Sequence, residues 1–219
     1  MPISATSQIN RYRNCETKNK TNLSEGFDKI LKKKQAENMD AKSFLSKLTS
    51  SELSEVQKEN HLANDINIQA LSKEGAENLF LMPVDQNKAV DLNNDGIVEV
   101  GEARMGIFPP PNAPESVKEA WTEASKNMSS DDMIHMQTKF LAAQIEKNAY
   151  KKSDGTWGIH DSGDAGWVNI FGDSKDSIIS LCNEIIYRID NPLESLTSEQ
   201  KKEDEYAKDI LKKFITLIG

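Results

Sequence analysis

The feature that most constrains this chain is a stretch of twelve residues, 91–102, with the sequence DLNNDGIVEVGE. Side-chain oxygens recur at every second residue, on Asp91, Asn93 and Asp95, and Gly96 follows directly. Glycine adopts a positive φ without the steric cost that other residues meet. The pattern therefore predicts a tight loop whose alternate side chains are oxygen donors and whose end turns back on its start.

The second half of the stretch carries the donors that would complete a cation site. Ca²⁺ takes six to eight oxygen ligands at about 2.3–2.6 Å. Ile97 would offer its backbone carbonyl, Glu99 would ligate directly or through water, and Glu102 would close the site as a bidentate carboxylate. The predicted metal ligands are Asp91, Asn93, Asp95, Ile97, Glu99 and Glu102.

These twelve residues resemble the calcium-binding loop of the EF-hand family, and the resemblance is limited to residues 91–102. It implies one bound Ca²⁺ as cofactor. It also implies a short strand around Val98, which in EF-hands pairs with a partner loop. The alternative interpretation is a loop rich in Asx turns, whose acidic residues serve solvation and capping.

The helices that would flank the loop are expected to be short. Pro83 leaves only residues 85–90 before the loop, about one and a half turns. The exiting helix is expected to begin at 100–102, where Gly101 weakens it by up to about 1 kcal/mol relative to alanine, and it soon meets Pro109. Wide helix opening, as in sensor EF-hands, is less expected here. We predict a dissociation constant of roughly 10⁻⁶ to 10⁻³ M.

A second stretch, 161–172 (DSGDAGWVNIFG), matches the same pattern poorly. Asp161 and Gly166 fall at matching positions. The positions that should supply further ligands have no side-chain donor: Gly163, Ala165 and Gly172. The stretch is either a degenerate partner loop or, as we expect, part of a small β-hairpin near 156–171, with TWGIH and GWVNIF as its strands.

Apolar residues at helical spacing predict a mainly α-helical fold. Ser72, and Thr197 with Gln200 three residues on, are expected helix N-caps. Most of the core should come from helices at 114–150, 174–190 and 197–218. The predicted organisation is a disordered tail (1–22), a helical segment with the loop (23–108), a Pro-rich linker or strap (109–112), and a helical domain with the hairpin (113–219).

Charge and hydropathy exclude several partners. Lysine and arginine total 27 and aspartate and glutamate 35, a formal net charge of −8. This acidity argues against nucleic acid and against anionic membrane surfaces, both of which need basic patches. The sequence has no apolar run of about 18 residues, so we expect no membrane span. Without a recognisable signal peptide, a cytoplasmic location is the default, and leaderless export is an alternative.

Together these features favour a non-enzymatic calcium-binding protein in which the ion modulates or stabilises a surface for an unidentified protein partner. A first alternative is an assembly component with Ca²⁺ as a permanent staple. A second is a hydrolase near His160 and Asp161 with an incidental calcium site, although adjacent residues in an extended chain point in alternate directions. Cys182 lies in an apolar stripe and is expected to be buried and inert. The sequence leaves the oligomeric state open.

Overall fold

The computed structural model describes residues 23–172 and 174–219, so the predicted tail, 1–22, lies outside the described residues. The described chain is mainly helical, as predicted, and it includes two antiparallel two-stranded sheets. It divides into two compact units. The first contains the described residues up to Asn93 together with Ile97–Met105, and the second contains Asn94–Gly96 and Gly106–Gly219. Among the described residues, none of the helices is both long and apolar enough to cross a membrane.

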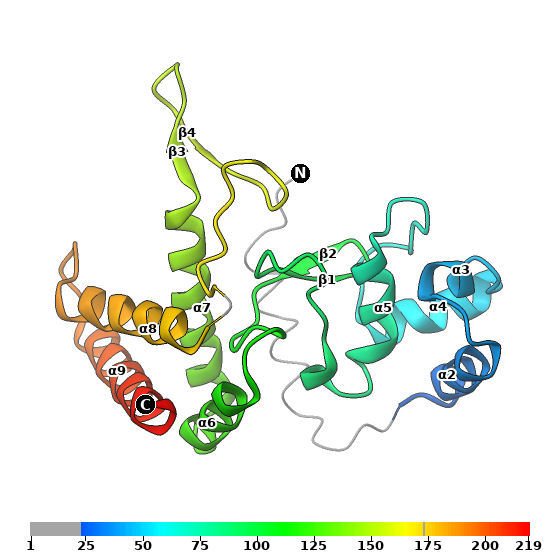
Figure 1. The fold of residues 1–219 in the computed structure, drawn as a ribbon, viewed down its shortest axis with the longest axis horizontal. Coiled ribbons are helices and arrows are strands. Elements are labelled where there is room, and N and C mark those ends of the chain that lie inside the picture. The colour runs from blue at the N-terminus through cyan, green and yellow to red at the C-terminus, as the bar shows by residue number, and fades with distance from the viewer. Residues whose placement is uncertain (1–22, 173) are drawn as a thin grey trace. The chain divides into compact units, whose positions relative to one another are not determined.

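Short capped helices build the first unit (Figure 1). Each helix begins where a side-chain oxygen accepts a backbone N–H of the first turn, and Ser72 does this for α5 as the sequence predicted. The elements are α2 (Glu25–Glu37), α3 (Ala41–Leu45), α4 (Ser50–Glu59), α5 (Lys73–Leu81), the 3₁₀ turn η1 (Gln86–Lys88), β1 (Val98–Val100) and β2 (Ala103–Met105).

The core of the first unit forms around Phe80 on α5. Its ring stacks on Phe27 at a centroid distance of 6.4 Å and meets the edge of Phe44 at 5.7 Å. Strand β1 lies against the same helix, where the Gly101 N–H donates to the Gly75 carbonyl at 2.9 Å. A Cβ at Gly75 would overlap the Gly101 carbonyl oxygen. The absence of a side chain at this position therefore lets α5 approach the hairpin closely.

Longer helices build the second unit, in agreement with the predicted helical ranges (Figure 1). Thr197 and Gln200 form the predicted capping box at the start of its last helix. The elements are α6 (Glu115–Ser125), α7 (Ser130–Lys147), β3 (Ala149–Lys151), β4 (Trp157–Ile159), α8 (Lys175–Asp190) and α9 (Ser198–Ile218).

Phe108, from the Pro-rich segment, lies at the centre of this second core. Its ring stacks on Phe140 at 3.8 Å and meets the edges of Trp121 at 4.8 Å and Phe214 at 5.5 Å. The Gln137 side chain of α7 donates to the Phe108 carbonyl at 3.1 Å. Ala113 is also buried. The segment 108–113 is thus packed as part of the second unit.

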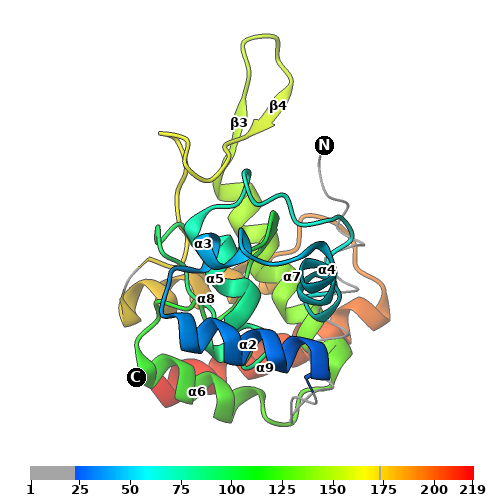
Figure 2. The ribbon, with the colours of Figure 1, turned by 90° about the vertical axis from the view of Figure 1, so that its right-hand side faces the viewer.

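The hairpin differs from the prediction in the identity of one strand. Trp157–Ile159 pairs with Ala149–Lys151 rather than with 166–171, and the resulting hairpin extends beyond the end of α7 (Figure 2). Two amides of α7 and its C-cap bind the backbone of Val168: Gln144 donates to its carbonyl at 2.8 Å, and Asn148 accepts from its N–H at 2.7 Å. The predicted second strand is wrong because side chains, and not a neighbouring strand, satisfy its backbone.

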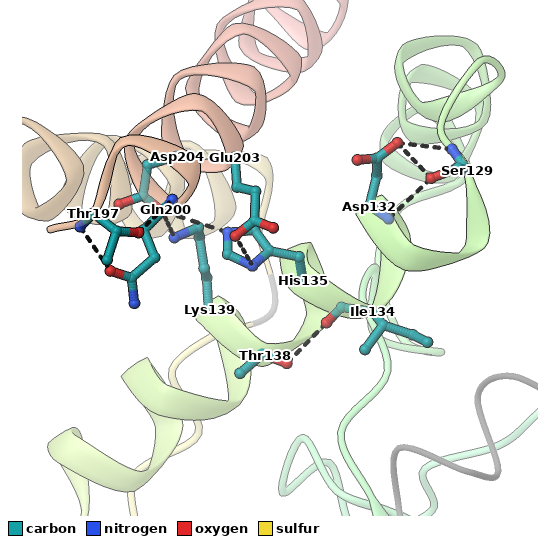
Figure 3. A network of polar contacts seen from close by, with 10 residues as sticks. All are labelled: Ser129, Asp132, Ile134, His135, Thr138, Lys139, Thr197, Gln200, Glu203 and Asp204. Atoms are coloured by element: carbon teal, nitrogen blue, oxygen red, sulfur yellow. Dashed lines mark hydrogen bonds and ion pairs between the residues drawn. The ribbon is translucent and has the colours of Figure 1, made fainter.

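A polar network joins α7 to the first turns of α9 (Figure 3). His135 Nε2 lies 3.4 Å from Asp204 Oδ1, and its Nδ1 lies 3.8 Å from Glu203 Oε2. The Lys139 ammonium also bonds Asp204. Asp204 therefore ties two turns of α7 to α9 at the edge of the aromatic core.

Truncating Phe108 tests its central place in the second core. Phe108→Ala is expected to lower the free energy of unfolding by about 3–5 kcal/mol, because it removes a buried ring and leaves a cavity. Leu193→Ala, at a fully exposed side chain, is the control and should change it by less than about 0.5 kcal/mol. Chemical denaturation of both variants gives the comparison. Equal, small effects would contradict the central role of Phe108.

Candidate metal centre

The backbone of the loop turns where the sequence predicted. Gly96 has a φ of 79°, and Asn94, two residues earlier, has a φ of 55°. Both lie in the left-handed region, which glycine adopts freely and asparagine tolerates better than most residues. Val98 then begins β1. The chain therefore reverses sharply between the alternating donors and the strand, as the resemblance implied for this part of the loop.

Neither flank of the loop forms an α-helix of the kind that borders an EF-hand loop. On the entering side, the short helix expected is reduced to η1. On the exiting side, the predicted helix beginning at 100–102 is wrong, because β1 and β2 form a hairpin with Gly101 and Glu102 as its turn. Gly101 has a φ of 61° at the first turn position, where type II′ hairpin turns place glycine. Its conformational freedom supports a turn here instead of weakening a helix.

Glu74, on α5, lies at the loop although sequence reasoning did not include it. Its buried carboxylate accepts the N–H of Leu92 at 2.7 Å and the N–H of Glu99 at 2.8 Å, and so bridges both sides of the loop. Burial raises the pKa of Glu74 to about 7, with a further upward contribution from the nearby charges of Asp91 and Glu99. In the sequence, an acid in the first turn of a helix is common, so nothing marked it.

Asn78, one turn further along α5, is the second residue that sequence reasoning missed. Its fully buried amide donates to the carbonyls of Val90 and Glu99, both at 2.8 Å. Its carbonyl oxygen accepts the Val90 N–H at 2.9 Å. One side chain thus satisfies three backbone groups on the two flanks of the loop, and α5 is the platform on which the flanks rest.

The predicted ligands are distributed unequally in the structure. Asp91 and Asp95 are buried, with 4% and 8% of their surfaces exposed, whereas Asn93 and Glu102 are exposed. Glu99 is half-buried, and its carboxylate accepts the Ser72 hydroxyl and lies 3.7 Å from the Arg104 guanidinium. Over residues 23–172 and 174–219, no three His, Cys, Asp or Glu side chains are arranged to hold a metal ion. In the described structure the four predicted carboxylates are therefore not assembled as a ligand group.

Two side chains of the poorly matching stretch 161–172 donate hydrogen bonds to the backbone of the loop. Within the second unit, the Trp167 indole donates to the Asp95 carbonyl at 2.9 Å, and the Asn169 amide donates to the Asn94 carbonyl at 2.9 Å. Asn112 adds a hydrogen bond to the Asn94 side chain at 3.0 Å. The contacts of 161–172 with residues 94 and 95 are thus hydrogen bonds from side chains and not strand pairing.

His160 and Cys182, two of the residues weighed for reactivity, occupy packing positions. The His160 ring stacks on Tyr150 at 4.3 Å and covers Gly166, where a Cβ would overlap it. Cys182 is fully buried, and burial raises the pKa of its thiol to about 12, in agreement with the expected inert thiol.

Comparison with protein-family models, curated proteins and solved structures finds no match to this chain.

Stability of the metal-free protein should depend on pH through Glu74. Because its pKa is raised in the folded state, the stabilising contribution is complete below about 4.5 and is lost as the pH rises through about 7. At about 1.4 kcal/mol per pKa unit, the loss is at most about 3 kcal/mol. Melting temperatures measured from pH 4.5 to 8 in chelator should fall for the wild type, and this slope should flatten in Glu74→Gln.

Asp65→Asn, at an exposed acid of the same unit, is the control and should keep the wild-type slope. A slope in Glu74→Gln as steep as that of the wild type would contradict the assignment to Glu74.

Gly96→Ala tests the close approach at the loop turn. A Cβ there would lie 2.5 Å from Asn169 Oδ1 and 3.0 Å from a Phe171 ring carbon, in addition to the strain of a φ of 79°. Gly155→Ala is a matched control, because Gly155 has a φ of 84° but nothing within 4 Å. We expect Gly96→Ala to destabilise by about 1–2 kcal/mol more than Gly155→Ala in denaturant titrations. Equal losses would show that backbone strain alone matters.

Proposed function

We propose that this protein is a non-enzymatic calcium-binding protein whose loop 91–102 takes one Ca²⁺, and that the ion mainly stabilises the fold. The observation that carries the proposal is the backbone of the loop. Gly96 has the positive φ that the sharp turn of an EF-hand loop requires, directly after the alternating donors Asp91, Asn93 and Asp95.

The electrostatics of the first unit support a cation. Glu74, Asp91 and Glu99 carry like charges close enough to raise the pKa of Glu74, and Glu74 and Asp91 are buried. Buried like charges oppose one another strongly because the surroundings screen them poorly. A divalent cation at the loop would offset this repulsion, so binding and folding would favour each other.

The flanks of the loop favour a stabilising role over a switch. A sensor EF-hand transmits binding by opening a pair of helices. Here the loop is preceded by the three-residue η1, and its second half forms a β-hairpin with β2 that is held against α5. A flank of this kind has no helix pair to open. Of the two non-enzymatic alternatives, we therefore favour a permanently bound, stabilising Ca²⁺ over a Ca²⁺ that switches the conformation.

The protein-interaction surface stays a prediction, as does the absence of a nucleic-acid partner, which the net charge of −8 supports. Within the second unit, the exposed apolar side chains of the β3–β4 hairpin are its best location. Trp157 and Ile159 leave 71% and 54% of their surfaces exposed. We name no partner for this surface.

Calorimetric titration with Ca²⁺ tests the site directly. Chelator-stripped wild type is expected to bind one ion with a dissociation constant of roughly 10⁻⁶ to 10⁻³ M. Glu102→Gln should weaken binding at least about tenfold, because it removes a charge and the bidentate closure. Glu194→Gln, an exposed acid outside the loop, is the control and should bind as the wild type does.

Two outcomes would count against the assignment. No binding at millimolar Ca²⁺ would overturn the proposal. Unchanged affinity in Glu102→Gln would overturn the twelve-residue ligand set, and a loss in Glu74→Gln instead would place the closing carboxylate on α5.

Melting curves and small-angle scattering with and without Ca²⁺ distinguish the staple from the switch. At a hundredfold excess over the dissociation constant, a staple should add about 2.7 kcal/mol of stability. The scattering profile should stay the same. A large change of profile on binding would favour the switch.

A further inference from the structure

The centre of the calcium loop, residues 94–96, is held by a distant segment of the second unit. The Trp167 indole N–H donates to the Asp95 carbonyl across 72 positions of sequence, and the Asn169 amide donates to the Asn94 carbonyl across 75. Both hydrogen bonds measure 2.9 Å. Contacts so remote in sequence persist only if the segment that makes them is itself firmly placed.

That segment is anchored to the aromatic core of the second unit. The Asn169 side-chain oxygen that lies against Gly96 also accepts the Phe171 N–H at 2.9 Å. Phe171 is buried, with its ring 6.0 Å from Phe108. Between them, Gln144 accepts the Ile170 N–H at 3.3 Å. The side chains that hold the loop turn are therefore fixed by the packing of α7 and the Pro-rich segment.

The hydrogen bonds from Trp167 and Asn169 use loop atoms other than the predicted coordinating oxygens. They use the backbone carbonyls of Asn94 and Asp95, the fourth and fifth loop residues. An EF-hand loop takes only one backbone carbonyl, at its seventh residue, here Ile97. The ion and the Trp167–Asn169 pair thus do not compete for the same atoms, and both favour the same turn.

We infer that Trp167 and Asn169 are positioning residues of the calcium loop, which hold residues 94–96 in the turn that binds the ion and link its occupancy to the folding of the second unit. This inference rests on the proposed calcium function. If the turn at residues 94–96 is already formed before the ion arrives, this part of the loop loses less conformational freedom on binding. By thermodynamic reciprocity, Ca²⁺ then strengthens the packing of Trp167 and Asn169.

Trp167→Phe tests the inference by removing the indole donor while keeping an aromatic ring. We expect Ca²⁺ to bind about 3- to 10-fold more weakly by calorimetry, which corresponds to the loss of one net hydrogen bond. Trp157→Phe is the matched control, because it makes the same substitution at an exposed position on β4 and should leave the affinity unchanged. Circular dichroism checks that both variants are folded.

A second variant and a spectroscopic readout keep the test decisive if Trp167→Phe unfolds. Asn169→Ala should weaken Ca²⁺ binding to a similar degree. In ¹⁵N–¹H spectra of the wild type, the Trp167 indole resonance should shift on Ca²⁺ addition and exchange its proton more slowly, whereas the Trp157 indole should not respond.

The outcomes separate the inference from the function on which it rests. If the wild type binds no Ca²⁺, the proposed function is overturned and the inference with it. If the wild type binds one ion, but folded Trp167→Phe or Asn169→Ala binds it within twofold of the wild type, the inference alone is overturned. The inference is also overturned if the Trp167 indole resonance does not shift while Ca²⁺ binds.

Discussion

The buried amide of Asn78 is the interaction on which the first unit's part of the candidate site depends. It forms three hydrogen bonds to the backbone of Val90 and Glu99, and neither residue has a helix or long strand to satisfy these groups otherwise. An unmade bond in a buried position costs about 1–3 kcal/mol, so this side chain specifies where the loop begins and ends. Glu74, one turn earlier on α5, also binds backbone groups on both sides of the loop, but through a carboxylate that accepts the N–H groups of Leu92 and Glu99.

The negative charge of Glu74 gives α5 an electrostatic effect on the loop in addition to its hydrogen bonds. A neutral residue in place of Glu74 would hold the backbone without opposing Asp91 and Glu99, whereas the pKa of the Glu74 carboxyl is raised by burial and further by these two charges. In the proposed function, a cation would balance this buried negative charge. Stabilisation would then be a more direct consequence of binding than motion. The ion would relieve the repulsion among the carboxylates of Glu74, Asp91 and Glu99. The helix α5 and the β1–β2 hairpin around them already have their backbone hydrogen bonds.

The sequence predicted the elements whose causes are local. Ser72 and Thr197 cap helices as expected, because a cap and its acceptor lie within one turn. The short entering helix and the turn at Gly96 also follow from proline and glycine alone. The predicted exiting helix and the predicted strand at 166–171 were wrong. A strand next to the loop and side-chain amides from α7 competed for those residues, and neither competitor is visible in the local pattern.

By itself, the sequence determined a mainly helical protein with a sharply turning, oxygen-rich loop, because periodicity, capping and glycine act over a few residues. Only the tertiary structure decided what supports that loop. Glu74 reaches it from 18 and 25 positions away, and Trp167 from 72. Such contacts depend on the path of the chain between them. The twelve residues therefore specify which oxygen donors the loop carries, and the rest of the chain specifies how firmly its backbone is held.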